Sequence, residues 1–335
     1  MRILVTGGAG FIGSNFVRRT LATRDSVTPV VLDAFTYAAH PDNLRDARGA
    51  ELCEVIRGDV RDAELVDRLV ARVDAVVHFA AESHNDNSLL DADPFIGTNI
   101  TGTVTVARAC TRHGVRLHHV STDEVYGDLA LDDPARFTPE TPYRPSSPYS
   151  ASKAAADHFV RAWERSHGLA ATISNCSNNY GPRQHPEKLI PRQICGLIDG
   201  RRPRVYGDGA NVRDWIHVDD HTDAVWAVLD RGEPGRTYLI GAEGERANVD
   251  VVGDLLECFG RDRDDFDRVT DRPGHDRRYA IDPSSTRALG WAPRHPDLRA
   301  GLAGTVAWYR AHEDWWRPAA AAAEARYRRR ERTLG

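Results

Sequence analysis

Short apolar segments alternate with helical patterns through the first half of this chain, and this alternation constrains its fold more than any other feature. Six runs rich in β-branched residues predict strands at 3–5, 30–32, 53–56, 75–79, 117–120 and 171–174. Helical patterns lie between them at 11–22, 63–71, 98–113 and 150–167. Because the strand runs are nearly continuous in apolarity, they are typical of parallel strands buried on both faces. The sequence therefore predicts a doubly wound, Rossmann-type α/β sheet that binds ligands at the carboxyl ends of its strands.

The rhythm of the sequence changes after about residue 176. Frequent Pro and Gly predict mostly loops from 178 to 209, and helical patterns return at 219–229 and 249–259. We therefore expect the doubly wound unit over 1–176, a smaller interleaved substrate-binding region over 177–318, and a helical polar tail over 319–335. The tail is rich in Ala and then in Arg, which is more typical of a solvated helix end than of a nucleic-acid site.

Composition excludes several classes of partner. The 335 residues are 41% hydrophobic and 28% charged, as in a globular protein, and a net charge of −5 favours neither nucleic acid nor an anionic membrane. No apolar run reaches the length of a membrane span, and residues 1–7 lead into a strand without a secretory h-region. Five scattered cysteines favour a reducing compartment and predict neither disulfides nor a metal site. We expect a cytoplasmic protein.

A glycine-rich turn follows the first predicted strand and opens the first predicted helix. Gly7, Gly10 and Gly13 form a GxxGxxG pattern, which permits a tight turn, a close approach of a pyrophosphate and close packing of helix on strand. Asp33 ends the second strand, 20 residues after Gly13. A carboxylate there would accept the ribose hydroxyls and repel a 2′-phosphate, which favours NAD over NADP. Asp59 and Val60 are placed to meet the adenine, and 79–83 to follow the cofactor backbone, although the alanines there also suit plain close packing.

Tyr149 and Lys153 are four residues apart, on one face of a predicted helix. An ammonium close to a phenol lowers the pKa of the phenol, so Tyr149 could take a proton from an alcohol while hydride leaves for a nicotinamide. Lys153 would also donate to the nicotinamide ribose. A YxxxK pattern alone is common by chance, and its position after a Rossmann-type loop and five strands is what makes it informative.

Two adjacent carboxylates, Asp123 and Glu124, follow Thr122 at the end of the fifth predicted strand. A hydroxyl at Thr122 is sufficient to hydrogen-bond a reacting oxygen, so the carboxylates need a reason of their own. Asp123 could cap a helix while Glu124 is solvated. The alternative is a general acid and a general base for the elimination of water, with pKa values separated by their environments.

Four segments together resemble one family: 7–13, 121–127 (STDEVYG), 149–153 and 175–182 (NCSNNYGP). They are similar to the dTDP-glucose 4,6-dehydratases of the extended short-chain dehydrogenase/reductase superfamily, and the likeness runs from about Ile3 to Trp316. Further supporting segments are 81–84 (AESH), 186–191 (PEKLIP), 213–215 (RDW) and 271–282 (DRPGHDRRYAID).

The resemblance implies a reaction on a nucleotide sugar. Tyr149 would deprotonate the glucose C4 hydroxyl, hydrogen-bonded by Thr122, as the C4 hydride passes to tightly bound NAD⁺. The 4-keto group then acidifies C5–H, so Glu124 would remove that proton while Asp123 protonates the departing C6 hydroxyl. Hydride returns to C6 and C5 is reprotonated, which gives the 4-keto-6-deoxy sugar nucleotide and regenerates NAD⁺.

The resemblance also implies the contacting residues. For NAD these are Gly7, Gly10, Phe11, Ile12, Gly13, Asp33, Ala34, Phe35, Thr36, Asp59, Val60, Phe79, Ala80, Ala81, Ser83, Thr98, Tyr149, Lys153 and Asn178. For the substrate they are Ser83, His84, Thr122, Asn179, Lys188, Leu189, Ile190, Arg204, Val205, Tyr206, Arg213, Asn248, Arg272 and His275. Among them, Lys188 and Arg213 would meet the diphosphate, and 204–206 would surround the nucleobase.

Two departures from the family pattern stand near these positions. Asn85 and Asn87 replace the Val and Arg of many members, for which we expect altered hydrogen bonding in the loop and retained activity. Ala34 replaces a Lys and removes one contact to the adenosine end.

The resemblance also implies an oligomeric state. The family is homodimeric, and the helices predicted at 98–113 and 150–167 are candidates for a four-helix interface.

Other functions stay open from the residues alone. One is a dehydratase that acts on UDP-glucose or another nucleotide hexose, and a second is a 4-epimerase, which the two carboxylates disfavour. GDP-mannose enzymes that use NADP are disfavoured by Asp33. A protein that binds NAD without chemistry would be expected to lose Tyr149, Lys153 or the acids.

The chain contains only two Lys, Lys153 and Lys188, beside 42 Arg. Both lysines fall in segments assigned to the active site.

Overall fold

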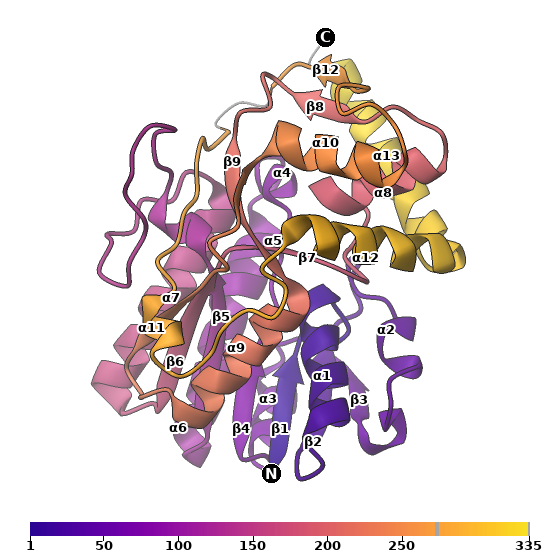
Figure 1. Ribbon diagram of the computed structural model, residues 1–335. Helices are drawn as coiled ribbons and strands as arrows, with labels where there is room; N and C mark the ends of the chain where they lie inside the picture. Colours follow the sequence, from indigo (N-terminus) through magenta and orange to yellow (C-terminus); the bar gives the residue numbers. More distant parts are fainter. Residues whose placement is uncertain (272–274, 334–335) are drawn as a thin grey trace.

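The computed structural model describes residues 1–271 and 275–333 (Figure 1). Its centre is a seven-stranded sheet in the order β3-β2-β1-β4-β5-β6-β10, in which every neighbouring pair is parallel. The strands are β1 (Arg2–Thr6), β2 (Thr28–Asp33), β3 (Glu54–Arg57), β4 (Ala75–His78), β5 (Arg116–Thr122), β6 (Ala171–Cys176) and β10 (Thr237–Ile240). The strand order reverses between β1 and β4, which is where doubly wound sheets bind ligands. The predicted Rossmann-type fold is confirmed.

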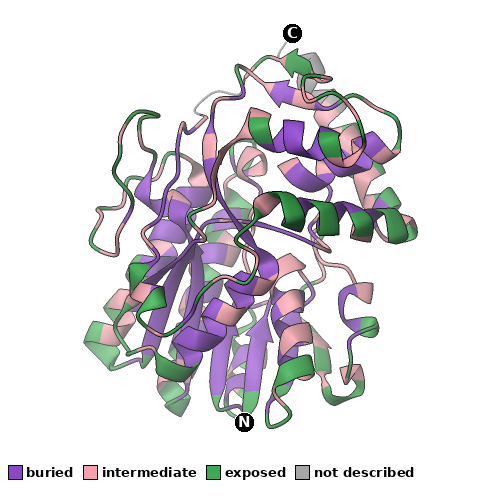
Figure 2. Ribbon diagram, in the orientation of Figure 1, coloured by how far each residue is buried: buried purple, intermediate pink, exposed green. Residues whose placement is uncertain are grey.

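Helices cover both faces of this sheet. On one face, α1 (Phe11–Thr23) and α9 (Val218–Arg231) bury apolar side chains against Ile3 and Val5 of β1. On the other face, α3 (Ala63–Val70), α6 (Thr103–His113) and α7 (Pro148–His167) enclose the core that contains Leu4. Successive strand residues thus face opposite cores, as the two-residue period of a strand requires. The central strands are accordingly buried along nearly their whole length (Figure 2).

A smaller set of elements lies above the carboxyl ends of the strands in Figure 1. Its strands are β7 (Asn178–Tyr180), β9 (Val212–His217) and β11 (Glu245–Ala247) in one sheet, and β8 (Arg204–Tyr206) and β12 (Asp267–Val269) in another. Its helices are α8 (Leu189–Ile198), α10 (Asn248–Cys258), α12 (Leu298–Ala311) and α13 (Glu313–Thr333). They share a core around Trp215, Leu255 and Trp316. Between these elements the chain returns to the large sheet to form α9, β10 and α11 (Ser284–Arg287).

Short helical turns occupy the loops at the carboxyl ends of the strands and beside the sheet. They are α2 (Asp42–Arg45), η1 (Ala50–Leu52), α4 (Asn85–Ser88), α5 (Asp93–Phe95), the π-helical η2 (Ile96–Gly102) and the 3₁₀ turn η3 (Asp123–Tyr126). Among the described residues, no helix is both long and apolar enough to cross a membrane.

Four predictions differ from the structure. The strand predicted at 53–56 is not buried on both faces, because β3 is the sheet edge and Glu54 and Val55 are exposed. Residues 189–198 form α8, although loops were predicted there. The helix predicted over 98–113 begins as the π-helical η2 before it becomes α6. The terminal helix starts at Glu313, before the predicted 319, and runs through Pro318.

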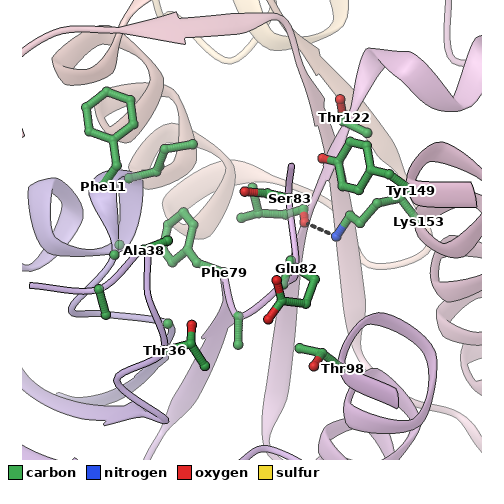
Figure 3. A pocket seen from close by; sticks show the side chains of 18 of the residues that line it. Phe11, Thr36, Ala38, Phe79, Glu82, Ser83, Thr98, Thr122, Tyr149 and Lys153 are labelled. Atoms are coloured by element: carbon green, nitrogen blue, oxygen red, sulfur yellow. Dashed lines mark hydrogen bonds between the residues drawn. The ribbon is translucent and has the colours of Figure 1, made fainter. Parts of the chain in front are cut away.

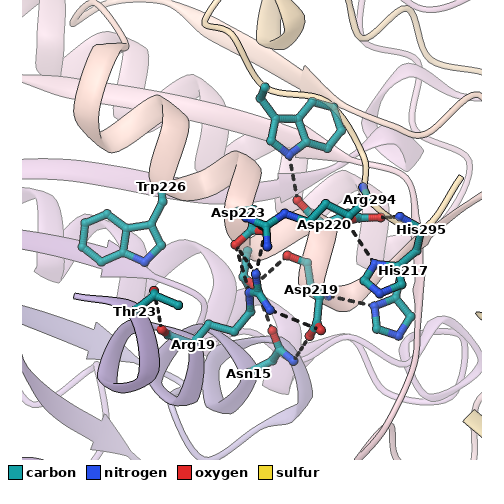
Figure 4. Close-up of polar contacts among 12 residues, drawn as sticks. Asn15, Arg19, Thr23, His217, Asp219, Asp220, Asp223, Trp226, Arg294 and His295 are labelled. Carbon is teal, nitrogen blue, oxygen red and sulfur yellow. Dashed lines mark hydrogen bonds and ion pairs between the residues drawn. The ribbon is translucent and has the colours of Figure 1, made fainter. Parts of the chain in front are cut away.

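A polar network fastens α9 to α1 and to the segment that precedes α12 (Figure 4). The buried Asp220 carboxylate accepts the backbone N–H groups of Arg294 and His295 at 2.8 and 2.9 Å. Arg19 of α1 pairs with Asp223 at 2.6 Å. Each of these bonds joins residues far apart in sequence, so the network ties the second half of the chain to the first helix.

Three potential metal ligands, His217, Asp219 and His295, also meet in this network. The Asp219 carboxylate already accepts from Asn15 at 2.7 Å and faces Arg19 at 3.3 Å. The rings of His217 and His295 lie 4.2 Å apart and only 30° from parallel. Stacked imidazoles direct their in-plane lone pairs side by side instead of toward one point, so this arrangement serves packing and hydrogen bonding.

We predict that Asp220→Ala lowers the free energy of unfolding by about 2–3 kcal/mol, because two backbone N–H groups lose a buried acceptor. Asp230→Ala on the same helix is the control, since Asp230 forms only a partly exposed pair with Arg24, worth about 0–1 kcal/mol. Denaturant titration of both variants measures the difference. Equal stability of the two variants would contradict this role of Asp220.

Candidate active site

Two adjoining cavities open where the strands of the large sheet end. The larger, of about 650 Å³, extends from the glycine-rich turn past the ends of β2, β4 and β5 to α7 (Figure 3). The smaller, of about 190 Å³, lies toward α8, β9 and α10. Among the residues that the structure describes, seven line both cavities and so mark their junction: Ser83, Glu124, Asn178, Asn179, Gln184, Glu187 and Lys188.

The glycine-rich turn lies against the end of β4. Gly7 has a φ of +70°, and a Cβ on it would lie 2.7 Å from the backbone nitrogen of Ala80. A Cβ on Gly13 would lie 2.2 Å from the Gly7 carbonyl oxygen. The first turn of α1 therefore opens directly on the larger cavity, which Gly10, Phe11 and Ile12 also line. This places backbone N–H groups and the positive end of the helix dipole at the cavity wall.

Asp33 at the end of β2 joins the turn to the cavity. Its two carboxylate oxygens accept the backbone N–H groups of Ala9 and Phe35, each at 2.8 Å. Burial raises the pKa of Asp33, and these backbone donors oppose the rise. Each carboxylate oxygen has a second lone pair, so the side chain can also accept from a ligand in the cavity that it lines.

Tyr149 and Lys153 lie in the first turns of α7 and both reach the larger cavity (Figure 3). Ser147 caps this helix by accepting the N–H of Ser150, whose hydroxyl in turn accepts the N–H of Ser147. Lys153 donates from Nζ to the carbonyl oxygen of Val120 at 2.8 Å. Burial raises the pKa of Tyr149 well above its ordinary value, and the nearby Glu124 carboxylate adds to the rise. The lowered pKa expected from the Tyr–Lys spacing is therefore not produced by these residues alone.

Thr122, Asp123 and Glu124 enter the same cavity from the end of β5 and the turn η3. Asp123 is 1% exposed, and burial together with Glu124 raises the pKa of its carboxyl group well above the usual range. Glu124 is less buried and accepts a hydrogen bond from the Asn85 amide at 3.2 Å. Thr122, not Asp123, caps the 3₁₀ turn by accepting the N–H of Glu124. The neighbouring carboxyl groups thus occupy different environments, as the acid–base hypothesis requires.

A buried network supports α7 from behind. The Asp157 carboxylate lies 3.2 Å from His119 and accepts from Tyr143 at 2.8 Å and from Asn175 at 3.1 Å. Burial would raise the pKa of Asp157, but His119 and Lys153 hold it below its ordinary value. A buried, ionised Asp157 balances the buried Lys153 ammonium one turn earlier on the same helix.

The smaller cavity collects most of the residues expected to contact a substrate. His84, Leu189, Ile190, Tyr206, Arg213, Asn248 and His275 line it together with the junction residues. Lys188 donates from Nζ to the Ser83 carbonyl oxygen at 2.7 Å, which fixes its ammonium at the junction. Arg213 is 5% exposed and lies 4.2 Å above the Tyr279 ring, and its guanidinium donates to the Asp276 carbonyl oxygen at 2.9 Å.

Every predicted catalytic residue lines the larger cavity, as does every predicted cofactor residue except Phe35. Phe35 takes a φ of +52° and donates its backbone N–H to Asp33. The Phe35 side chain does not line the cavity. Among the predicted substrate residues, Arg204 lines neither cavity. Val205 is buried in the core beneath β8, because it points opposite to Tyr206 on that strand. Arg272 lies outside the described residues.

The tail prediction was wrong at one residue of the site. Tyr327 of α13 lines the smaller cavity, donates to the Glu187 carbonyl oxygen at 2.9 Å and lies 3.6 Å beneath the Arg192 guanidinium. Glu324 on the same helix pairs with Arg192 at 3.3 Å. At Glu324 and Tyr327, α13 is therefore docked on α8 instead of solvated. The only feature of the sequence that could have indicated this contact is Tyr327 itself, an aromatic residue within an Arg-rich run.

Further cavity residues were also not predicted. Arg61, Gln184, His185 and Glu187 line the larger cavity, and Arg192, Gln193, Trp215 and Tyr279 line the smaller one. Glu187 and Trp215, for example, lie inside the motifs 186–191 and 213–215.

A Rossmann-type sheet with a glycine turn, a Tyr–Lys helix and a substrate cavity across its strand ends defines an extended short-chain dehydrogenase/reductase. The family model described as GDP-mannose 4,6 dehydratase matches residues 4–299. A dTDP-glucose 4,6-dehydratase of Mycolicibacterium smegmatis is 62% identical over 331 residues, covering 98% of this chain and 99% of the relative. The corresponding protein of Mycobacterium tuberculosis H37Rv matches equally well.

The same relationship appears among solved structures. The dTDP-glucose 4,6-dehydratase DesIV of Streptomyces venezuelae, crystallised with NAD and dTDP, superposes with a TM-score of 0.91 at 47% identity, covering 95% of this chain and all of that one. The chain belongs to the dTDP-glucose 4,6-dehydratase family. The predicted resemblance is confirmed.

We predict that Tyr327→Ala releases the end of α13 from α8. The cation–π contact with Arg192 and the hydrogen bond to Glu187 together contribute about 2 kcal/mol, so the undocked fraction should rise roughly 30-fold. Faster tryptic cleavage within the Arg-rich tail measures this release. Tyr327→Phe, which keeps the ring but loses the hydroxyl donor, should show a smaller increase. Unchanged cleavage in both variants would show that Tyr327 does not hold the tail.

Proposed function

We propose that this protein dehydrates dTDP-glucose to dTDP-4-keto-6-deoxyglucose with a tightly bound NAD. The observation that carries the proposal is the pair Asp123 and Glu124, which follow β5 in different environments and share one cavity with Tyr149 and Lys153. The names of the most similar relatives support the same reaction. Oxidation alone needs Tyr149, Lys153 and a hydroxyl, whereas elimination of water needs an acid and a base as well.

The residues of the larger cavity fit a dinucleotide. Gly7 and Gly13 leave space that a Cβ would fill, the first turn of α1 offers N–H donors to a pyrophosphate, and Asp33 stands where ribose hydroxyls would bind. The relatives crystallised with NAD support this choice. When bound, NAD accepts hydride from C4 of the sugar and returns it to C6. The carboxylate of Asp33 would repel a 2′-phosphate, which favours NAD over NADP.

Tyr149 is proposed as the base for the C4 hydroxyl, with Thr122 hydrogen-bonding the same oxygen. Both side chains face the larger cavity, and the Thr122 hydroxyl opposes part of the rise in the pKa of Tyr149. Because burial and Glu124 raise the pKa of Tyr149, its phenolate form requires positive charge nearby. Lys153 on the same helix contributes one positive charge to this cavity, which by itself does not offset the rise in the pKa of Tyr149.

Asp123 and Glu124 are proposed as the acid and the base of the elimination. Burial raises the pKa of Asp123, which favours its protonated form, and a protonated carboxyl group can donate to the departing C6 hydroxyl. Among the described residues its Oδ2 atom has no hydrogen-bond partner, although it is buried. Glu124, at the junction of the two cavities, would remove the proton from C5.

The smaller cavity is proposed to hold the nucleotide part of the substrate. Lys188 at the junction and Arg213 on β9 supply positive charge for the diphosphate. Tyr206, Asn248 and His275 would surround the nucleoside end. Recognition of thymine over uracil rests on one methyl group, which is worth only about 1–3 kcal/mol.

We also propose that two copies pair through η2–α6 and α7, because Ile96 and Phe159 expose large apolar side chains on these helices. The mass of the protein in solution tests this pairing.

We expect the purified protein to convert dTDP-glucose to a 4-keto product without consuming added NAD, measured by the absorbance of the product in alkali. UDP-glucose should react with a kcat/KM about 10–200-fold lower. Absence of any keto product from either sugar, with NAD bound, would overturn the proposed function. Formation of UDP-galactose instead would indicate a 4-epimerase.

We predict that Asp123→Asn and Glu124→Gln keep oxidation at C4 but slow elimination by about 10²–10⁴-fold, because each variant loses one proton-transfer group. Reduced cofactor should therefore accumulate during turnover, and near-ultraviolet absorbance measures it. Tyr149→Phe is the control, since it should block oxidation and leave that absorbance flat. Elimination at the normal rate in either acid–base variant would contradict its assigned role.

A further inference from the structure

One contact at the junction of the cavities has no role in the mechanism above. The Asn85 side chain donates from Nδ2 to Oε2 of Glu124 at 3.2 Å. Asn85 begins α4 and Glu124 belongs to η3, 39 residues later, so tertiary structure alone brings them together. Both residues line the smaller cavity, and Glu124 also lines the larger one.

The backbone on each side of this contact is fixed. The Ser88 hydroxyl donates to the Asn85 carbonyl oxygen at 2.6 Å, and Ser88 itself is 2% exposed. Buried His84 precedes Asn85 and accepts the backbone N–H of Asn87 at 3.0 Å. On the other side, the Thr122 hydroxyl accepts the N–H of Glu124 at 3.4 Å. With both backbones held, the amide can fix where the carboxylate points.

The charges around Glu124 make such a donor useful. The Glu124 carboxylate contributes to the raised pKa values of Asp123 next to it, Tyr149 on α7 and Tyr279, so its negative charge acts on all three groups. Arg213 on β9 and Lys188 at the junction contribute positive charge to the same cavity. An N–H donor to the carboxylate favours its ionised form without adding a charge.

We propose that Asn85 is a positioning residue that holds the Glu124 carboxylate, ionised and directed to the junction of the two cavities, for removal of the C5 proton. This inference rests on the proposed function and adds a residue to it. The Asn85 amide touches neither the reacting carbon nor the departing oxygen. Its effect passes through Glu124 and is confined to the elimination step.

The same loop supplies a matched control. Asn87 is two residues further along α4, and its amide donates to the Tyr37 hydroxyl at 3.3 Å. Asn85 and Asn87 are both partly buried. Asn85→Ala and Asn87→Ala therefore remove the same group from the same short helix, but only the first loses the bond to Glu124.

The experiment measures kcat between pH 5.5 and 9 for the wild type, Asn85→Ala, Asn85→Asp and Asn87→Ala, with reduced cofactor recorded by absorbance during turnover. In Asn85→Ala, loss of a donor to a carboxylate raises the pKa of the base. The acidic limb of the pH profile of kcat should move up by about one pH unit. Below that limb kcat should fall about tenfold, and above it kcat should change little. Reduced cofactor should accumulate at low pH, because C4 oxidation still precedes the slowed step. Asn85→Asp, nearly isosteric but without the donor, should shift the limb at least as far.

Asn87→Ala should keep the wild-type limb. An acidic limb in Asn85→Ala and Asn85→Asp equal to that of Asn87→Ala would overturn the role of Asn85, as would a loss uniform across pH or confined to KM. If the wild type itself forms no keto product from dTDP-glucose, the proposed function fails instead. The two failures are therefore distinguishable in one set of measurements.

Discussion

The architecture of the site depends on one close backbone approach, between the glycine turn and the end of β4. Gly7 leaves no space for a side chain against Ala80, and Gly13 leaves none against the Gly7 carbonyl. This contact stands where the strand order reverses, between β1 and β4. It sets the angle at which α1 leaves the sheet, and hence the opening of the larger cavity. The cavity could not keep its shape if either glycine were a larger residue.

The chemistry depends on how a single turn divides two adjacent carboxyl groups. In a 3₁₀ turn, consecutive side chains lie about 120° apart around the axis. Asp123 is thereby directed to the interior, where it is 1% exposed, whereas Glu124 reaches the junction of the cavities. Burial disfavours the charge on the first group, and an amide donor favours the charge on the second. The turn thus places the proposed acid and the proposed base of the elimination on neighbouring residues in different environments.

The elements predicted from the sequence are those whose burial is visible in the hydrophobic pattern of their residues. Parallel strands such as β1 and β5 are covered on both sides, so they appear as continuous apolar runs. The helix α8 was missed because it contains Pro191 and Gly196, although Pro is tolerated in the first turn of a helix.

Topology explains which of the predicted site residues share a cavity. Predicted residues at strand ends and in the glycine turn line the larger cavity, because topology brings strand ends together without reference to side-chain contacts. Val205 was misplaced because three consecutive residues of a strand cannot all face one ligand. Tyr327 was missed because its partners, Arg192 and the Glu187 carbonyl, lie more than 130 residues away along the chain. Local patterns contain no record of such contacts.

The two lysines show what side-chain shape adds to charge. Lys153 and Lys188 each place an ammonium against a single backbone carbonyl, of Val120 and of Ser83, at the walls of the larger cavity. A guanidinium is a planar fork that is best satisfied by two acceptors in its plane, as Arg19 is by Asp223 on the helix surface. Beside Tyr149 there is room for a compact charge, and Lys153 is 4% exposed. In a chain with 42 Arg, both Lys thus stand where a compact ammonium meets a single carbonyl acceptor at the cavity wall.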